Sequence, residues 1–285
     1  MVRIHLERTF NVGPELLWEL VVDPDYYRFW TESFSEGSEF VGDWTKGSDI
    51  HFITENENGK ESGMLSEIVE SQWPEFISIK HVGIVVNGVN DSDSPLAQEW
   101  SGSFENYRFI PKEDGTSIFS VEQDFPEEQA EEFTVNWEES FDRMAVLIET
   151  NPDFGKVITL REKSRHRPEV IWERLVTPEK VMTWNYASDD WHSPSAKNNL
   201  EVGGEFHYEM AAKDGGESFD FWGTYTKIVA PKKLSFVLGD GRTVRIDIFE
   251  KPYGCLIEER FEAEQQNDLN LQRQGWQNIL KNLAR

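Results

Sequence analysis

Polar side chains that could carry acid–base chemistry or hold a ligand recur at every second position of residues 101–107. Ser101, Ser103, Glu105 and Tyr107 share one face if this segment is a β-strand, because successive side chains of a strand point to opposite sides. On a concave face, Glu105 and Tyr107 would be polar anchors inside a cavity. On a convex face they would be ordinary surface groups, and both interpretations stay open at this stage.

His192, next to Trp191, is the second candidate for acid–base chemistry, because a histidine titrates close to neutral pH with little tuning. Asp189 and Asp190 immediately precede this pair. Adjacent carboxylates in a strand point to opposite faces, and in a loop they are usually solvated. We therefore interpret the two aspartates as loop residues rather than as a paired acid and base.

The motifs of the common catalytic mechanisms are absent from the sequence, which has no G-x-S-x-G, P-loop, H-E-x-x-H or C-x-x-C. Gly239-Asp240-Gly241 lacks the third glycine of a dinucleotide-binding loop and predicts a turn between two strands. His166, His192, His207 and Cys255 are too scattered to predict a metal site. We expect no cofactor and no metal, and we assign no catalytic residue.

Aromatic side chains supply the other candidate residues, since small apolar ligands are usually held in aromatic cavities with a few polar groups. Aromatic side chains also form ordinary cores. Trp18 and Trp172 lie on helical faces that must pack, so we assign both to the core. A cavity position and a core position stay open for Trp30, Trp184, Trp191 and Trp276.

An internal repeat predicts the elements that position these residues. Residues 14–24 align with residues 168–178 without a gap, and Pro, Glu, Trp, Glu, Val and Pro recur. The copies end alike, because three residues with one helical spacing close each of them: Trp137, Phe141 and Met144, then Trp276, Leu280 and Leu283. Pro and Gly in residues 151–155 mark the boundary. The sequence therefore predicts two tandem domains, 1–151 and 156–285.

Within each copy, the pattern predicts a strand, short helices, several strands and one long closing helix. Apolar and polar residues alternate along residues 2–10, as in a half-buried first strand. Pro14 and Pro168 suit the first turn of a helix, and Asp240-Gly241 is a two-residue hairpin signal. Asn267 or Asp268 would cap the last helix. These elements predict an α+β fold, a curved antiparallel sheet around a long C-terminal helix.

The acidic charge belongs almost entirely to the first copy. Residues 1–150 hold 9 Lys and Arg against 32 Asp and Glu, a formal charge of −23 out of −25 for the chain. Nucleic acid and anionic membranes are therefore not expected partners. The surface is interpreted first as solubilising, with a basic protein surface as the alternative partner. A single cysteine and the lack of a signal peptide or apolar span favour the cytoplasm.

The second copy resembles the SRPBCC (START-like) superfamily, in the branch named after the C-terminal domain of the activator of the heat-shock protein 90 ATPase. The resemblance rests on motifs spread over residues 156–285, namely Ser188-Asp189-Asp190-Trp191-His192, Val202-Gly203-Gly204, Phe219-Asp220-Phe221, Gly223-Thr224-Tyr225 and Gly275-Trp276. The first copy is similar to another member through His81-Val82-Gly83, Asn87-Gly88-Val89 and Trp100-Ser101-Gly102-Ser103-Phe104. The resemblance implies the helix-grip fold, with a cavity between sheet and helix.

Three functions follow from this resemblance. The favoured one is non-enzymatic binding of an apolar or amphipathic small molecule in the cavity of each domain. The alternatives are a protein-interaction module related to chaperone ATPase activation, and a cavity enzyme of cyclase or hydrolase type that uses His192 or Glu105. The residues expected to line the cavities are Trp30, Trp100, Glu105, Tyr107, Trp137, Phe141, Trp184, Trp191, His192, Phe206, Tyr208, Phe221 and Trp276.

Overall fold

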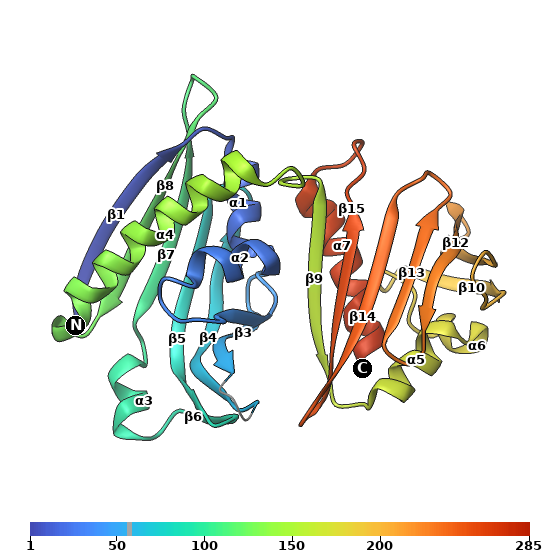
Figure 1. The fold of residues 1–285 in the computed structure, drawn as a ribbon, viewed down its shortest axis with the longest axis horizontal. Helices are drawn as coiled ribbons and strands as arrows, with labels where there is room; N and C mark the ends of the chain where they lie inside the picture. The colour runs from blue at the N-terminus through green and yellow to red at the C-terminus, as the bar shows by residue number, and fades with distance from the viewer. Residues whose placement is uncertain (56–58) are drawn as a thin grey trace. The chain divides into compact units, whose positions relative to one another are not determined.

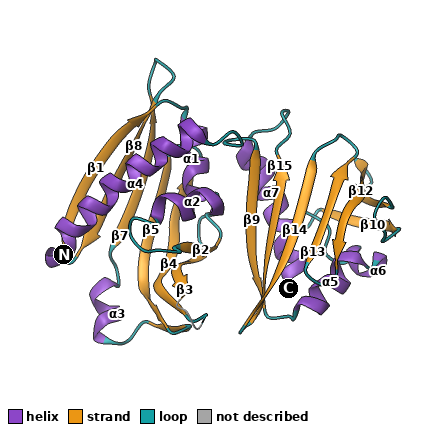
Figure 2. Cartoon of the chain, viewed as in Figure 1, coloured by secondary structure: helices purple, strands orange, loops and turns teal. Residues whose placement is uncertain are grey.

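The computed structural model describes residues 1–55 and 59–285 and divides the chain into two compact units, Met1–Phe154 and Gly155–Arg285. Each unit has an antiparallel sheet and its own hydrophobic core. The α+β helix-grip fold predicted from the repeat is confirmed in both units (Figures 1 and 2).

The first domain begins with a strand and two short helices and ends with its longest helix. Its elements are β1 (Val2–Phe10), α1 (Pro14–Val22), α2 (Pro24–Thr31), β2 (Glu39–Gly42), β3 (Asp49–Glu55), β4 (Glu61–Gln72), β5 (Phe76–Val86), β6 (Val89–Asp91), α3 (Pro95–Trp100), β7 (Phe104–Pro111), β8 (Ser117–Phe125), a 3-10 turn (Glu127–Gln129) and α4 (Ala130–Thr150). The strand order is β1-β8-β7-β5-β4-β3-β2, with β6 paired to β5.

The second domain repeats this plan without counterparts of β6 and α3. Its elements are β9 (Val157–Ser164), α5 (Pro168–Val176), α6 (Pro178–Val181), β10 (Trp191–Asn198), β11 (Glu205–Ala212), β12 (Ser218–Val229), β13 (Lys233–Leu238), β14 (Thr243–Lys251), β15 (Gly254–Glu262) and α7 (Leu269–Ala284). The order β10-β11-β12-β13-β14-β15-β9 matches the first sheet strand for strand, in reverse listing. The repeat in the sequence is thus a repeat of topology.

Local sequence explains where the helices and turns begin. Pro14 and Pro168 occupy the first turn of α1 and α5, where a missing backbone N–H costs no helical hydrogen bond. Asp268 caps α7 by accepting a hydrogen bond from the backbone N–H of Leu271 at 2.8 Å. Gly241, with a φ of +91°, turns the chain between β13 and β14 as the hairpin signal predicts.

The closing helices pack on one face of their sheets and complete the two cores. Trp137, Phe141 and Met144 of α4 are buried in the first core, and α1, α2 and α4 lie on the same face of that sheet (Figure 1). Leu280 and Leu283 of α7 are buried in the second core. The helical spacing therefore identified the inward faces of both helices.

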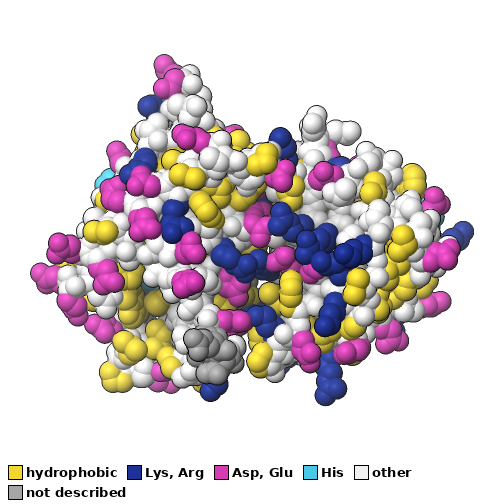
Figure 3. Space-filling view, in the orientation of Figure 1, with side chains coloured by type: hydrophobic (Ala, Val, Ile, Leu, Met, Phe, Trp, Pro, Cys, Tyr) yellow, Lys and Arg dark blue, Asp and Glu magenta, His cyan; other side chains and the backbone are white. Residues whose placement is uncertain are grey.

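The surfaces of the two domains differ in charge. Acidic side chains are spread over the first domain, and Lys and Arg side chains gather over the strands of the second (Figure 3). Two ion pairs join strands there: Arg161 with Glu258 at 2.7 Å, and Lys233 with Asp247 at 3.1 Å. The charge asymmetry of the sequence is therefore visible on the folded surface.

Candidate functional site

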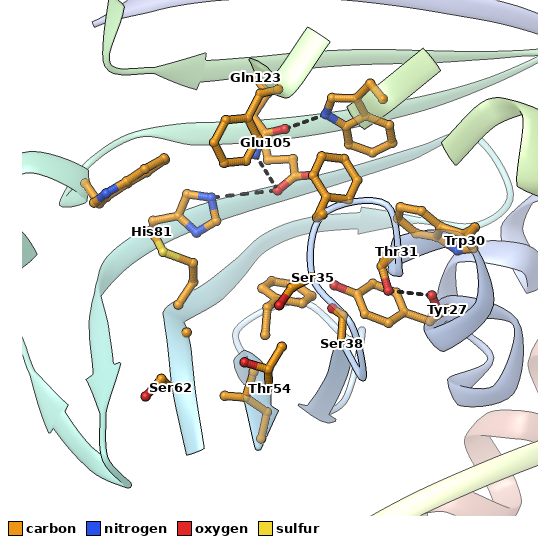
Figure 4. Close-up of a pocket in the computed structure, with 18 of the residues that line it drawn as sticks. Tyr27, Trp30, Thr31, Ser35, Ser38, Thr54, Ser62, His81, Glu105 and Gln123 are labelled. Atoms are coloured by element: carbon orange, nitrogen blue, oxygen red, sulfur yellow. Dashed lines mark hydrogen bonds and ion pairs between the residues drawn. The ribbon is translucent and has the colours of Figure 1, made fainter. Parts of the chain in front are cut away.

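The first domain encloses a cavity of about 380 Å³ between its sheet and helices α2 and α4. Eight of its 19 lining residues carry aromatic rings, namely Tyr27, Trp30, Phe34, Phe52, Trp100, Tyr107, Phe133 and Trp137. Figure 4 shows Glu105, Gln123 and His81 converging on one side, with Ser38, Thr54 and Ser62 on the opposite side. The cavity thus combines aromatic walls with a cluster of titratable and amide groups on one side and hydroxyl groups on the other.

The titratable and amide groups form a network centred on Glu105. Glu105 on β7 pairs across the sheet with Gln123 on β8, so their side chains enter the cavity together. Gln123 Nε2 donates to Glu105 Oε2 at 3.1 Å, and its Oε1 accepts from Trp137 Nε1 at 2.8 Å. The hydroxyl of Tyr107 donates to Glu105 Oε1. Every group of this buried network has a partner, which fixes its orientation.

His81 on β5 approaches the same carboxyl from a third strand. Its Nε2 lies 3.7 Å from Glu105 Oε2, and its Nδ1 lies 2.8 Å from the hydroxyl oxygen of Ser66. Burial lowers the pKa of His81 to about 4, so the ring is neutral at pH 7. When the Ser66 hydroxyl donates to Nδ1, the neutral ring carries its hydrogen on Nε2, the nitrogen nearer to Glu105.

Burial also changes the charge of Glu105, whose side chain is in the interior with 8% of the residue exposed. It raises the pKa of Glu105 from 4.5 to about 7, and the hydrogen bond from Tyr107 opposes this rise. Near neutral pH the carboxyl therefore exchanges between its acid and its base form. Such a group accepts or donates a proton readily, and it binds a donor or an acceptor according to pH.

The first domain's predicted residues fall into two groups. Trp30, Trp100, Glu105, Tyr107 and Trp137 line the cavity. Phe141 does not, because it lies one turn of α4 beyond Trp137, where helix and sheet close on each other. Its ring is fully buried against Phe10 and Phe119.

The serines expected beside Glu105 take other positions, because β7 begins only at Phe104. Ser101 ends α3, and the hydroxyl of Ser103 donates to the backbone carbonyl of Trp100. The alternation predicted from residue 101 onward therefore holds only within β7.

The second domain has a smaller cavity of about 230 Å³ at the corresponding place. Trp184, Phe206, Tyr208, Phe221 and Trp276 line it, as do three further aromatic residues that sequence reasoning missed, Phe219, Tyr225 and Phe236. The hydroxyl oxygens of Tyr208 and Tyr225 lie 3.4 Å apart, and burial raises the pKa of both tyrosines. Both hydroxyls are therefore neutral hydrogen-bonding groups.

Trp191 and His192 lie outside this cavity, where the sequence prediction placed them inside. Both begin β10, the edge strand of the sheet, and a bulge between His192 and Ser195 shifts the register there. Trp191 packs beside Phe219 with 5.8 Å between ring centroids. Asp189 and Asp190 lie in the exposed loop before β10, as expected. His192 is therefore separate from the aromatic wall.

Glu259 is the acidic residue that the sequence prediction missed. It lies on β15, lines the second cavity and is 6% exposed. The sequence indicates its inward position, because Cys255, Ile257 and Phe261 are the other three members of an alternating row on one face of the strand, and Glu259 is its only charged member. Gln123 interrupts the apolar row of β8 in the same way.

Neither a cluster of metal-binding side chains nor a membrane-spanning helix is found in the part of the chain that the structure describes. Residues 1–55 and 59–285 contain no group of three or more His, Cys, Asp or Glu side chains that could hold a metal ion. Within the same ranges, no helix combines the length and apolar character needed to cross a bilayer.

Comparison with known proteins identifies the family. The family model described as activator of Hsp90 ATPase homolog 1-like protein matches residues 11–149 and 165–285. No curated protein matches the chain. A solved AHSA1-like protein from Aeromonas hydrophila is 40% identical over 45% of this chain and 89% of its own, with a TM-score of 0.44.

Two further solved structures illustrate the range of similarity. Chr148 from Cytophaga hutchinsonii is 38% identical over 44% of this chain and 87% of its own, with a TM-score of 0.39. The di-domain ARO/CYC protein BexL from the BE-7585A biosynthetic pathway is 12% identical over 100% of this chain and 99% of its own, with a TM-score of 0.42. The family model covers both halves, so this chain belongs to the activator of Hsp90 ATPase homolog 1-like family as a tandem pair of SRPBCC helix-grip domains.

Proposed function

We propose that each domain binds a small amphipathic molecule between its sheet and its closing helix. The observation that carries this proposal is the first cavity, where about 380 Å³ of space is lined by aromatic rings and carries the Glu105 network on one side. An apolar ligand body gains by leaving water for such a wall. A polar group on the ligand is held by the Glu105 network.

The geometry defines what the ligand must carry. Gln123 and Tyr107 already donate to the two oxygens of Glu105, and Trp137 holds the other end of Gln123. A ligand hydroxyl placed beside Glu105 donates to the ionised carboxylate or accepts from the protonated acid. We therefore infer a ligand with one hydroxyl-type group and an apolar remainder.

The test uses a variant that obstructs the cavity without touching the core. Ser35 is exposed and lines the cavity, so Ser35→Trp fills its mouth. Titration of the full chain with 4-butylphenol, followed by calorimetry, is expected to show binding that weakens at least about tenfold in Ser35→Trp. Ser92→Trp, at an exposed serine outside the cavity, is the matched control. Equal binding by the wild type and both variants would contradict the proposal.

A second candidate function, acid–base catalysis, is favoured by one observation, the pKa of about 7 at Glu105. General acid–base groups contribute most when their pKa lies near the working pH. The measurement that decides is the pH profile of any conversion found for a bound molecule. A catalytic Glu105 gives an inflection near pH 7, and Glu105→Gln lowers the rate by about 10² or more. An unchanged rate removes this candidate.

A further inference from the structure

The second cavity contains a carboxyl group in an unusual state. Glu259 enters it from β15, and 6% of the residue is exposed. Across the sheet its partner is Ile246, which offers no hydrogen-bond donor in its side chain. Glu259 therefore faces the cavity from an apolar part of the sheet.

No described residue satisfies this carboxyl. Within residues 1–55 and 59–285, no side chain donates a hydrogen bond to Glu259 or forms an ion pair with it. Burial alone raises the pKa of Glu259, to about 8. A buried carboxyl without partners is costly, so a ligand that brings a positive charge or a hydrogen-bond donor to Glu259 would remove this cost.

The other polar groups that line the cavity are already engaged. Arg242 donates to Asp240 Oδ2 at 2.8 Å and to the backbone carbonyl of Glu262 at 3.2 Å. The hydroxyls of Tyr208 and Tyr225 face each other, and Asn185 Nδ2 contacts the sulfur of Met210 at 3.1 Å. Together with Glu259, these are the charged and titratable groups facing the cavity from its described walls. Among these groups, Glu259 is the one without a hydrogen-bond or ion-pair partner in residues 1–55 and 59–285.

Aromatic rings, together with Leu, Ile and Met side chains, make up the rest of the lining. Phe206 lies at the centre of the aromatic wall, with its centroid 4.8 Å from that of Tyr208, 5.4 Å from that of Tyr225 and 5.7 Å from that of Phe221. Trp276 of α7 packs edge-on against Phe221 at 5.7 Å. Aromatic faces attract cations through their quadrupole, most strongly where water is excluded.

We propose that the second cavity selects a small organic ammonium ion, held by the carboxylate of Glu259 and by the surrounding ring faces. This inference rests on the proposed function, since it requires that the cavity admit a ligand. The cation gives the buried carboxylate its missing partner, and the pair enters the apolar space with no net charge. A neutral molecule of the same shape gains only the apolar contacts.

Choline and 3,3-dimethylbutan-1-ol are the probes, because they share one shape and differ in the charge of the central atom. Calorimetry with the full chain at pH 9, where Glu259 is ionised, is expected to give at least about tenfold tighter binding of choline. The charge of choline does not change with pH, so the pH dependence of its affinity measures the ionisation of Glu259. We expect this affinity to fall about tenfold between pH 9 and pH 7, as Glu259 becomes protonated. Glu259→Gln removes the preference and the pH dependence.

Glu250→Gln is the control, because Glu250 is exposed on β14 and does not line the cavity. It should leave both affinities unchanged. Equal binding of the two probes, unaffected by Glu259→Gln, overturns the ammonium site and leaves ligand binding intact. Failure of both probes to bind at millimolar concentration overturns the ammonium site and also counts against ligand binding in this domain.

Discussion

The two cavities occupy equivalent places but distribute their polar groups differently. In the first domain, β7 and β8 place Glu105 opposite Gln123. At the corresponding pair of strands in the second domain, β14 and β15 place Ile246 opposite Glu259. The carboxyl of the second domain therefore lies on the neighbouring strand, and the position equivalent to Glu105 is the apolar Val244.

The partners of the carboxyl have changed with it. Leu6 and Leu160 each lie eight residues before the proline that begins the next helix, and they pair with Val121 and Glu259. These two residues pair in turn with Tyr107 and Ile246, so Ile246 is the counterpart of Tyr107. His81 on β5 has Leu238 as its counterpart on β13, because each lies two residues beyond an equivalent strand partner, Ile79 of Glu105 and Phe236 of Val244. One cavity thus keeps a satisfied polar network and the other keeps a single carboxyl. The comparison teaches that the same sheet-and-helix topology accommodates different polar groups in its two cavities.

The largest expected effect is on the pH dependence of stability at Glu259. Below about pH 4.5, folded and unfolded chains both hold its proton, so the group contributes nothing. Between 4.5 and 8 the unfolded chain ionises while the folded domain stays protonated, so stability falls as pH rises, by roughly 3 to 5 kcal/mol. Hydrogen-exchange mass spectrometry of β15 peptides checks this. Glu259→Gln should abolish the fall, and an unchanged fall would contradict the buried carboxyl.

Leucine substitutions at Gln123 and Glu259 are expected to change the stability of their domains in opposite directions. Gln123→Leu leaves Trp137 Nε1 without a partner and Glu105 with the hydrogen bond from Tyr107 alone, and we expect the first domain to lose about 2 to 3 kcal/mol. Glu259→Leu removes a carboxyl without partners from an apolar wall, and we expect the second domain to gain stability at pH 9. Domain-resolved hydrogen exchange measures both. Destabilisation of both domains would mean that Glu259 has a structural partner.

The smallest expected effect is at Tyr107. Its hydrogen bond holds the pKa of Glu105 below the value that burial alone would give. Tyr107→Phe therefore raises the pKa of Glu105 above about 7, by about 1 unit, and costs about 1 kcal/mol at pH 8. Carbon-detected NMR of the Glu105 carboxyl follows the titration directly. A pKa that stays constant or falls would show that Tyr107 does not stabilise the carboxylate.

The repeat made the fold predictable, because residues 14–24 and 168–178 start equivalent helices and Trp137 and Trp276 close equivalent domains. Cavity residues were harder to predict. Phe141 shares its helical face with Trp137, and only the convergence of helix and sheet decides which of the two meets open space. The spacing along one helix indicates which side chains point inward, but not whether each of them meets the cavity or the closely packed core.

Trp191 and His192 show a second limit, because a bulge on an edge strand changes which side chains turn inward, and no pattern in the sequence marks it. The face of Glu105 was likewise undetermined until β7 was paired with β8. Glu259 differs from these, since strand alternation alone would have placed it inside.

The segment from β6 through α3 has a consequence for how the two halves evolve. It has no counterpart in the second domain, yet it supplies Trp100 to the first cavity. Ala97 is the residue of α3 that is buried, so this appendage contributes little to the core. Substitutions within this segment can change the shape of the first cavity while the hydrogen-bonded sheet of the domain stays intact. The amino-terminal half thereby has a route to new ligand preferences that its sister half lacks.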